Sequence, residues 1–432
     1  MYSLRSVRFG APLVLALALA GCSSSGDAAD TSNSGGGSSA TEDVQVEVFS
    51  WWTAPGESEA LQALIDLHQA TYPHERIYNA ATDPKVLSGG TEAKAVLDMR
   101  LQDGDPPDAF QTNAYELKQG KFSDKLDMLE PLDAIFEEQG LTKDVAPEVL
   151  NDVTIDGHIM SVPVNVHREN GLFYNISVFK KNGLKPPQTM AEFLDVCAKL
   201  KKAGVTPLAI STSQSWIIDK VFMALALGSM GPDNYVKYFV DKTPVDPEVF
   251  SPAIDLLDQV LTDYIDVEGA AADGFGWTQA ADALHDGTAG MFIHGDWAKG
   301  YLVQLGWTPN VDFGVVSSPD SGGAFIYGMD VFGVPAGAKH PNEAHDFVRT
   351  IASSEGQVKF NEAKGSSPVR LNVDDAGLDA MAKEIYADFK SSEHRIPTVG
   401  VPAAWDDGFG QLAKDHDKEA LLQTFIDNPI GG

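Results

Sequence analysis

The sequence is poor in cysteine and in basic residues. Its 432 residues include two cysteines, Cys22 and Cys197, which is too few for a paired-cysteine metal site. Lysine and arginine number 31 against 62 aspartates and glutamates, so the formal net charge is −31 at pH 7. Binding to nucleic acid requires a basic surface, and we therefore expect no nucleic-acid partner. The acidic excess is typical of a well-solvated surface.

Familiar catalytic motifs are also missing. The chain contains no Gly-x-Ser-x-Gly elbow, no His-Glu-x-x-His pair and no phosphate-binding loop. A glycoside hydrolase would need two carboxylates roughly 5–10 Å apart across the scissile bond. Glu57 and Asp330 can be imagined as such a pair, but no catalytic motif surrounds them. We therefore expect no catalytic residue, no cofactor and no metal, and keep a secreted glycoside hydrolase as the alternative from another class.

The amino terminus has the form of a secretory signal peptide. Arg5 and Arg8 precede an apolar run at 11–20, which is shorter than the roughly 20 residues needed to span a bilayer. The run ends in Leu19-Ala20-Gly21-Cys22, which resembles the bacterial lipobox. This resemblance implies cleavage after residues 1–21 and acylation of Cys22. Each buried methylene contributes about 0.8 kcal/mol, so two or three acyl chains make a stable membrane anchor.

A polar tract follows the first cysteine. Residues 22–43 are rich in Ser, Gly, Ala, Thr and Asp, and such a composition predicts a flexible tether. Cys197 instead lies on the apolar side of a predicted helix at 191–203, together with Phe193 and Leu194. We expect it to be a small core residue, and with Cys22 acylated no intrachain disulfide can form.

From residue 44 onward, strand and helix patterns alternate. Residues 44–49 alternate apolar and polar side chains, whereas 57–72 place apolar residues at helical spacing. Asp156-Gly157 predicts a hairpin turn, and Thr189 with Glu192 predicts a helix-starting capping box. Further helices are predicted at 92–102, 216–227, 234–240, 252–264, 277–286, 342–351, 354–362 and over most of the chain from 376, with strands at 76–81, 172–174, 205–210 and 289–293. This alternation indicates an α/β architecture, in which ligands bind at strand ends.

Several ordered segments resemble the extracellular solute-binding proteins of ABC importers, in the large group that handles sugars. They include Phe49-Ser50-Trp51-Trp52, the Gly-Asp-Pro-Pro-Asp-Ala-Phe-Gln run at 104–111, Gly295-Asp296-Trp297-Ala298 and the Lys-Gly-Ser-Ser-Pro-Val-Arg run at 364–370. Within that family the chain looks most similar to glucose- and mannose-type binding proteins, through the segments at 162–168, 276–280 and 329–335.

The resemblance implies a two-lobed periplasmic-binding-protein fold. Each lobe would be a mixed sheet flanked by helices, with the sugar in the cleft between lobes and hinge crossovers near Val164, Ser317 and Ser366. The first lobe would comprise 44–164 plus 318–365, and the second 165–317 plus 366–432. The implied partners are a sugar and the ABC permease subunits with their ATPase. The protein would be a monomer held by lipid on the extracytoplasmic face of the cell membrane.

Sugar capture needs flat aromatic surfaces for the C–H faces of the ring and polar groups for its hydroxyls. Adjacent strand residues face opposite ways, so at least one of Trp51 and Trp52 should leave the core. Trp277 follows a flexible Gly274-Phe275-Gly276 lead-in, although each tryptophan can also serve as packing. With these, the resemblance gives the predicted ligand-binding residues Trp51, Trp52, Glu57, Gln111, Asn113, His167, Trp277, Asp296, Trp297, Asp330 and Lys364. Asn165 and Arg168 are weaker candidates, and we expect Arg168 to form a salt bridge.

Some roles at this site stay open. Asp330 can accept hydrogen bonds from two vicinal hydroxyls or pair with Lys364, and Glu57 can bind hydroxyls or simply favour a helix start. The similar proteins have a histidine where Asn113 stands and another near 399–402, where this chain has none. These differences leave a glucose-like monosaccharide as the first expectation, with an oligosaccharide or another polyol as the alternative.

Overall fold

The computed structural model describes residues 43–80 and 90–430, and the body from Asp43 onward forms one compact unit. The predicted signal peptide, the lipidation at Cys22 and nearly all of the tether lie outside the described residues. No helix within the described ranges is both long and apolar enough to cross a bilayer.

The first sheet has five strands in the order β2-β1-β3-β13-β6. They are β1 (Val44–Phe49), β2 (Glu75–Asn79), β3 (Ala109–Asn113), β6 (Val162–Pro163) and β13 (Asp330–Gly333). β1 pairs in parallel with β2 and β3, whereas β13 runs antiparallel to β3 and β6. The last strand to enter this sheet therefore lies inside it, between two strands that come early in the chain.

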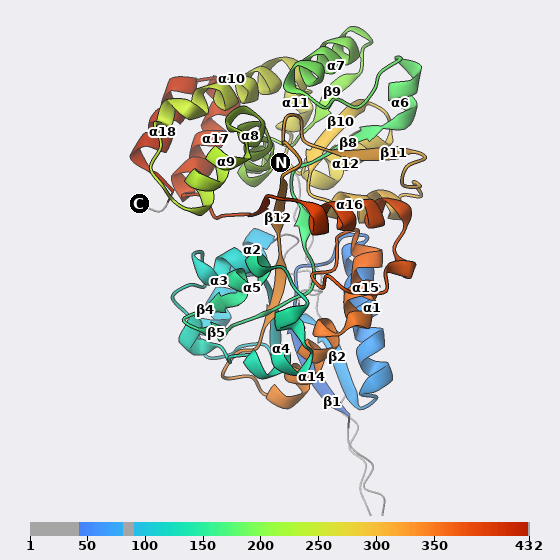
Figure 1. Cartoon of the computed structure of the whole chain (residues 1–432), viewed down its shortest axis with the longest axis vertical. Coiled ribbons are helices and arrows are strands. Elements are labelled where there is room, and N and C mark those ends of the chain that lie inside the picture. The colour runs from blue at the N-terminus through green and yellow to red at the C-terminus, as the bar shows by residue number, and fades with distance from the viewer. Residues whose placement is uncertain (1–42, 81–89, 431–432) are drawn as a thin grey trace, which may run out of the picture. The chain divides into compact units, whose positions relative to one another are not determined.

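Helices from both halves of the chain cover this sheet. α1 (Glu57–Thr71) packs against α14 (Pro341–Ala352) and α15 (Ser354–Lys364), which are far away in sequence (Figure 1). Their apolar faces meet in a core that contains Trp52 and Leu64.

The second sheet has four strands in the order β11-β8-β10-β9. They are β8 (Gly171–Asn175), β9 (Thr206–Ala209), β10 (Ala289–His294) and β11 (Phe313–Ser317). β8 is antiparallel to β10 and β11, and β9 is parallel to β10. The sheet is thus mixed, as expected from the sequence, and its strands are consecutive along the chain.

The carboxyl-terminal helices pack onto the middle of the chain. α17 (Ala403–Asp415) and α18 (Lys418–Asp427) contact α8 (Ser215–Met230) and α10 (Ser251–Gln259), as Figure 1 shows. Trp405 is at the centre of this contact and stacks on Phe425 with ring centroids 3.8 Å apart.

A small third sheet lies on the passages between the two larger ones. It contains β7 (His167–Arg168), β12 (Phe325–Gly328) and β14 (Arg395–Pro397) in the order β14-β12-β7. The chain leaves the first sheet after β6, passes through β7 and enters the second sheet at β8. It returns from β11 through β12 to β13. The domain boundaries expected from the sequence remain a prediction.

The remaining elements are short helices, single turns, a hairpin and some longer helices. They are α2 (Gly90–Gln102), α3 (Ala114–Lys118), η2 (Leu126–Met128), α4 (Asp133–Glu138), η3 (Leu141–Lys143), α5 (Pro147–Val153), β4 (Thr154–Ile155), β5 (His158–Ile159), α6 (Ile176–Lys181), α7 (Met190–Lys202), α9 (Pro232–Tyr235), η4 (Val236–Val240), η5 (Pro247–Phe250), η6 (Val260–Tyr264), α11 (Val267–Ala270), α12 (Trp277–His285), α13 (Trp297–Gln304), η7 (Asp375–Gly377) and α16 (Ala380–Ser391).

Several local predictions are confirmed. Asp156 and Gly157 have φ of 51° and 85° and join β4 to β5 in a hairpin. Thr189 and Glu192 form the predicted capping box at the start of α7, with each side chain accepting a bond from the other's backbone N–H. Cys197 is buried and forms no disulfide, and burial raises the pKa of its thiol.

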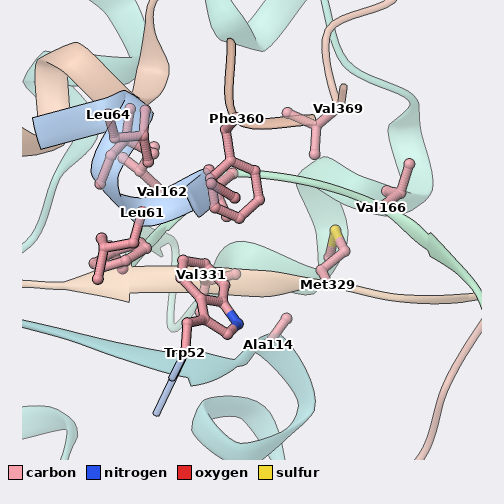
Figure 2. Close-up of a cluster of buried hydrophobic side chains, with 14 of the residues drawn as sticks. Trp52, Leu61, Leu64, Ala114, Val162, Val166, Met329, Val331, Phe360 and Val369 are labelled. Carbon is pink, nitrogen blue, oxygen red and sulfur yellow. The ribbon is translucent and has the colours of Figure 1, made fainter. Parts of the chain in front are cut away.

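The first core is built around Trp52. Its indole is 1% exposed and lies between Phe332 and Phe360, with ring centroids 5.7 and 4.7 Å away. Leu61 and Leu64 reach the same cluster from α1 (Figure 2). Trp52 thus takes the packing role that the sequence left open.

Truncating a leucine of α1 tests this packing. We expect Leu64→Ala to lower the free energy of unfolding by about 2–5 kcal/mol, because Leu64 is fully buried and its loss leaves a cavity. Leu67→Ala on the same helix should cost clearly less, since Leu67 is only half-buried. Denaturant titrations of both variants measure the difference, and equal losses would contradict the assignment of this face to the core.

Candidate functional site

A single buried carboxylate, Asp330, collects hydrogen bonds from four side chains. Its Oδ1 accepts from Gln111 Nε2 at 3.1 Å and Asn113 Nδ2 at 3.2 Å. Its Oδ2 accepts from Asn165 Nδ2 at 3.1 Å and His167 Nε2 at 3.0 Å. Burial tends to raise the pKa of the Asp330 carboxyl, but the hydrogen bond and positive charge of His167 outweigh it, and the pKa is lowered.

His167 joins this carboxylate to a second one. Its Nδ1 lies 2.5 Å from Asp296 Oδ1, and Asp296 Oδ2 also accepts from the backbone N–H of Arg168 at 2.8 Å. Burial opposes a charge on the ring, yet the charges and hydrogen bonds of Asp296 and Asp330 raise the pKa of His167 to about 9. At neutral pH the imidazolium therefore donates from both nitrogens.

Strand register brings these groups together. Asp330 is opposite Asn113 in the antiparallel pair of β13 and β3, and Gln111 shares the face of Asn113 because it is two residues away. Ser50, at the end of β1, donates to Gln111 Oε1 at 2.6 Å and fixes the orientation of that amide. The network thus lies where β3 ends and β13 begins.

A second charged pair lies at the end of α15. Lys364 forms a close ion pair with Glu57 at the start of α1, and its ammonium nitrogen is 5.3 Å from the centroid of the Trp52 ring. Lys364 is 2% exposed. The sequence allowed a pair between Lys364 and Asp330, but the ion pair that Lys364 forms is with Glu57. The charge of Lys364 still helps to lower the pKa of Asp330.

Three tryptophans surround a buried histidine, His294, at the end of β10. Trp277 stacks on it with centroids 5.7 Å apart, and Trp216 lies at 5.5 Å. Trp297 Nε1 donates to His294 Nε2 at 3.0 Å, and its ring meets His167 edge-on at 5.0 Å. Burial holds the pKa of His294 well below its ordinary value, so the ring is neutral.

The predicted residues thus fall into connected groups. Gln111, Asn113, His167, Asp296 and Asp330 form one hydrogen-bonded network, which Trp297 touches. Glu57 and Lys364 pair beside Trp52.

Trp51 is half-buried on another side, with the ammonium of Lys94 5.5 Å from its ring centroid. Trp51 and Trp52 diverge as strand alternation requires.

Three residues of these groups were not predicted as ligand-binding: Ser50, Trp216 and His294. Asn165, a weaker candidate from the sequence, is two residues before His167 in an extended segment and so shares its face. Trp216 and His294 are brought together only by the packing of α8 against β10, for which the sequence carries no local signal.

The combined chemistry is that of a binding site for a polar, uncharged molecule. Amides, a carboxylate and an imidazolium offer hydrogen bonds beside indole rings, and each cationic group here is paired with a carboxylate. No group of three or more His, Cys, Asp or Glu residues suited to a metal ion occurs within residues 43–80 and 90–430.

A family model described as "Bacterial extracellular solute-binding protein" matches residues 54–358. The chain belongs to this family. The binding protein is 33% identical over 393 residues to an uncharacterized ABC transporter extracellular-binding protein of Pyrococcus horikoshii, with 90% of this chain and 86% of the relative covered. A probable sugar-binding periplasmic protein of Brucella suis is 31% identical over 366 residues, covering 84% and 83%.

More distant similarities complete the comparison. A glucose-binding protein of Saccharolobus solfataricus is 21% identical over 385 residues, covering 85% of this chain and 68% of the relative. The structure of a Thermus thermophilus maltotriose-binding protein matches with a TM-score of 0.66 at 19% identity, covering 88% of this chain and 98% of the other. These similarities confirm the predicted family and the two-lobed α/β fold of the binding protein.

The buried histidine makes stability depend on pH. The pKa of His167 is about 9 when folded, above its ordinary 6.5, so its stabilisation is complete below about pH 6.5 and is lost as the pH rises through 9. We expect the free energy of unfolding of the unmodified protein to decrease over this range. The His167→Gln variant should lack the part of this decrease that comes from deprotonation of His167. Denaturant titrations at about pH 6 and pH 9 measure it.

His158→Gln provides the control, because the His158 side chain is 61% exposed. This variant should keep the pH dependence of the unmodified protein. A pH dependence that survives unchanged in His167→Gln would contradict the charge state assigned to the Asp296–His167–Asp330 network.

Proposed function

We propose that this binding protein captures a sugar outside the cytoplasm and delivers it to an ABC importer. The observation that carries the proposal is the Asp330–His167 network next to the Trp277 and Trp297 rings. Indole faces suit the C–H surfaces of a pyranose, and the amides and carboxylate suit its hydroxyls. The names of the Brucella and Saccharolobus relatives, which refer to sugar and glucose, support the same ligand class.

Within this class we propose a glucose-like monosaccharide. Asp330 already accepts four hydrogen bonds, which fills the capacity of a carboxylate. A sugar hydroxyl would replace the Gln111 or Asn113 amide at Oδ1, and the released amide could then donate to a sugar oxygen. Since Lys364 and His167 are both paired with carboxylates, a neutral sugar fits better than a sugar phosphate. An oligosaccharide or another polyol remains the alternative.

The charge states disfavour the hydrolase alternative. A glycosidase needs one carboxyl with a raised pKa to protonate the leaving group. The pKa of Asp330 is lowered, and Glu57 is held in an ion pair with Lys364. We propose that the protein binds its sugar without chemical change.

The amino terminus supports a membrane-anchored location. We propose that residues 1–21 are removed, that Cys22 carries the lipid, and that 22–43 tether the monomeric body near the permease and its ATPase. The lipobox resemblance of Leu19-Ala20-Gly21-Cys22 supports this arrangement.

A calorimetric panel tests the sugar ligand. We expect one or more hexoses or short oligosaccharides to bind with micromolar or tighter affinity. Trp277→Ala should weaken that binding about tenfold or more, because a stacking surface is lost. Trp307→Ala is the matched control, since Trp307 packs on Phe313 and His285 away from the Asp330 network. Absence of heat across a broad panel would refute the sugar proposal.

The anchor is tested by detergent-phase partitioning of the full-length chain expressed in a bacterium that processes lipoproteins. We expect the unmodified protein in the detergent phase and Cys22→Ala in the aqueous phase. Cys197→Ala replaces the other cysteine and should partition like the unmodified protein. Detergent-phase recovery of Cys22→Ala would show that the anchor is elsewhere.

A further inference from the structure

A small cavity with both polar and apolar walls lies beside α8, outside the network around Asp330. Its walls include Glu169, just after β7, Asp219 and Lys220 on α8, Tyr235 on α9 and Thr398, just after β14. The cavity volume is about 10 Å³, measured as the space open to the centre of a water molecule, and this is enough for about one water.

The cavity contains polar atoms that lack partners. Among the described residues, Asp219 Oδ1 and Thr398 Oγ1 are buried and have no hydrogen-bond partner. Asp219 as a whole is 9% exposed. The Tyr235 hydroxyl has only a sulfur acceptor, Met223 Sδ at 3.3 Å. A buried polar group without a partner costs about 1–3 kcal/mol, so this cavity favours a guest that supplies hydrogen bonds.

One carboxyl at the cavity, that of Asp219, is outside the local ion pair and can interact with a hydrogen-bond donor. Lys220 and Glu169 form a close ion pair, so Asp219 remains as the carboxyl without a cation of its own. Burial raises the pKa of Asp219 to about 7, and near neutral pH its carboxyl can both accept and donate hydrogen bonds. A hydroxyl group, which also does both, matches this wall.

Helix spacing connects the cavity to the proposed sugar site. Trp216 and Lys220 are four residues apart on α8 and so share one face of that helix. Trp216 contacts His294, and the charges of Lys220 and His167 both help to lower the pKa of the His294 ring. One wall residue of the cavity, Lys220, therefore lies next to Trp216, which contacts His294.

The extended segment after β7 makes a second connection. Glu169 is two residues beyond His167 and lies on the same face of the chain. Gly328, opposite His167 in the third sheet, permits this position, since a Cβ there would come within 2.1 Å of Glu169 Oε1. One wall residue of the cavity is thus two residues along the chain from the Asp330 network.

We infer that this cavity is a specificity subsite that receives the exocyclic hydroxymethyl group of a hexopyranose. The inference rests on the proposed sugar-binding function and identifies the substituent of the sugar that the cavity recognises. The ring hydroxyls lie at the ring edge, where the Asp330 network offers partners. The hydroxymethyl group alone extends by one carbon beyond the ring, and its oxygen is the size of the water that the cavity admits.

Sugars with and without this group test the inference. D-xylose is D-glucose without the hydroxymethyl group, and L-arabinose stands in the same relation to D-galactose. We expect the unmodified protein to prefer the hexose of a pair by about tenfold or more, as the loss of a buried hydrogen-bond partner predicts. Thr398→Val should reduce this preference at least about fivefold in calorimetric titrations and leave pentose affinity nearly unchanged.

Two further variants keep the result interpretable. Thr398→Val removes a hydroxyl that has no partner, so its thermal midpoint should not fall; if it fails to fold, Asp219→Leu, of similar size and without a hydrogen-bonding atom, takes its place with the same expected effect. Ser161→Ala removes another buried hydroxyl without a partner, between β5 and β6 and away from the cavity, and should keep the hexose preference.

The outcomes separate this inference from the proposed function. If the unmodified protein binds hexoses but the Thr398→Val or Asp219→Leu variant keeps the full preference over pentoses, the cavity holds only a structural water and the inference is wrong. If hexose and pentose weaken equally, the subsite assignment is also wrong. If no sugar binds to the unmodified protein, the proposed function fails and the inference fails with it.

Discussion

The arrangement of polar groups in this protein depends on one buried chain of charges, Asp296–His167–Asp330. Two carboxylates share one imidazolium, and the negative charge that remains is stabilised by amide and backbone N–H donors. The three residues come from the end of β10, from β7 and from β13, which belong to three different sheets. Holding these elements at hydrogen-bond distance places Gln111, Asn113 and Asn165 around the same carboxylate.

Pairing of charges also determines what the site can attract. Lys364 is paired with Glu57 and Lys220 with Glu169, so the local cations are balanced by nearby carboxylates. Neither lysine is therefore left unpaired to attract an anionic ligand such as a phosphate. Discrimination must come from the direction of hydrogen bonds and the shape of the aromatic walls, which is how a neutral polyhydroxyl compound is distinguished.

Local chemistry made many elements of the fold predictable. The apolar spacing of α1, the turn at Asp156-Gly157 and the capping box at Thr189 depend on neighbouring residues and follow from them directly. The strands β11 to β14 were not predicted, because each has only three to five residues and is defined by partners elsewhere in the chain. β13, buried throughout, lacks the alternation that reveals a strand exposed on one side.

The site also combines residues that the sequence could identify with residues that only packing brings together. Family resemblance named Asp330, Glu57 and Lys364 as separate ligand-binding residues, without the hydrogen bonds and the ion pair that connect them to their neighbours. The grouping of Trp216 and His294 arises from packing between α8 and β10, which no local pattern indicates. Because β13 lies between β3 and β6, the two large sheets are completed at different times during synthesis of the chain. The second sheet can assemble as soon as residue 317 has emerged from the ribosome, whereas β3 and β6 must wait for residues 330–333. Until then β3 presents an open edge, which makes the nascent first sheet the stage most exposed to aggregation.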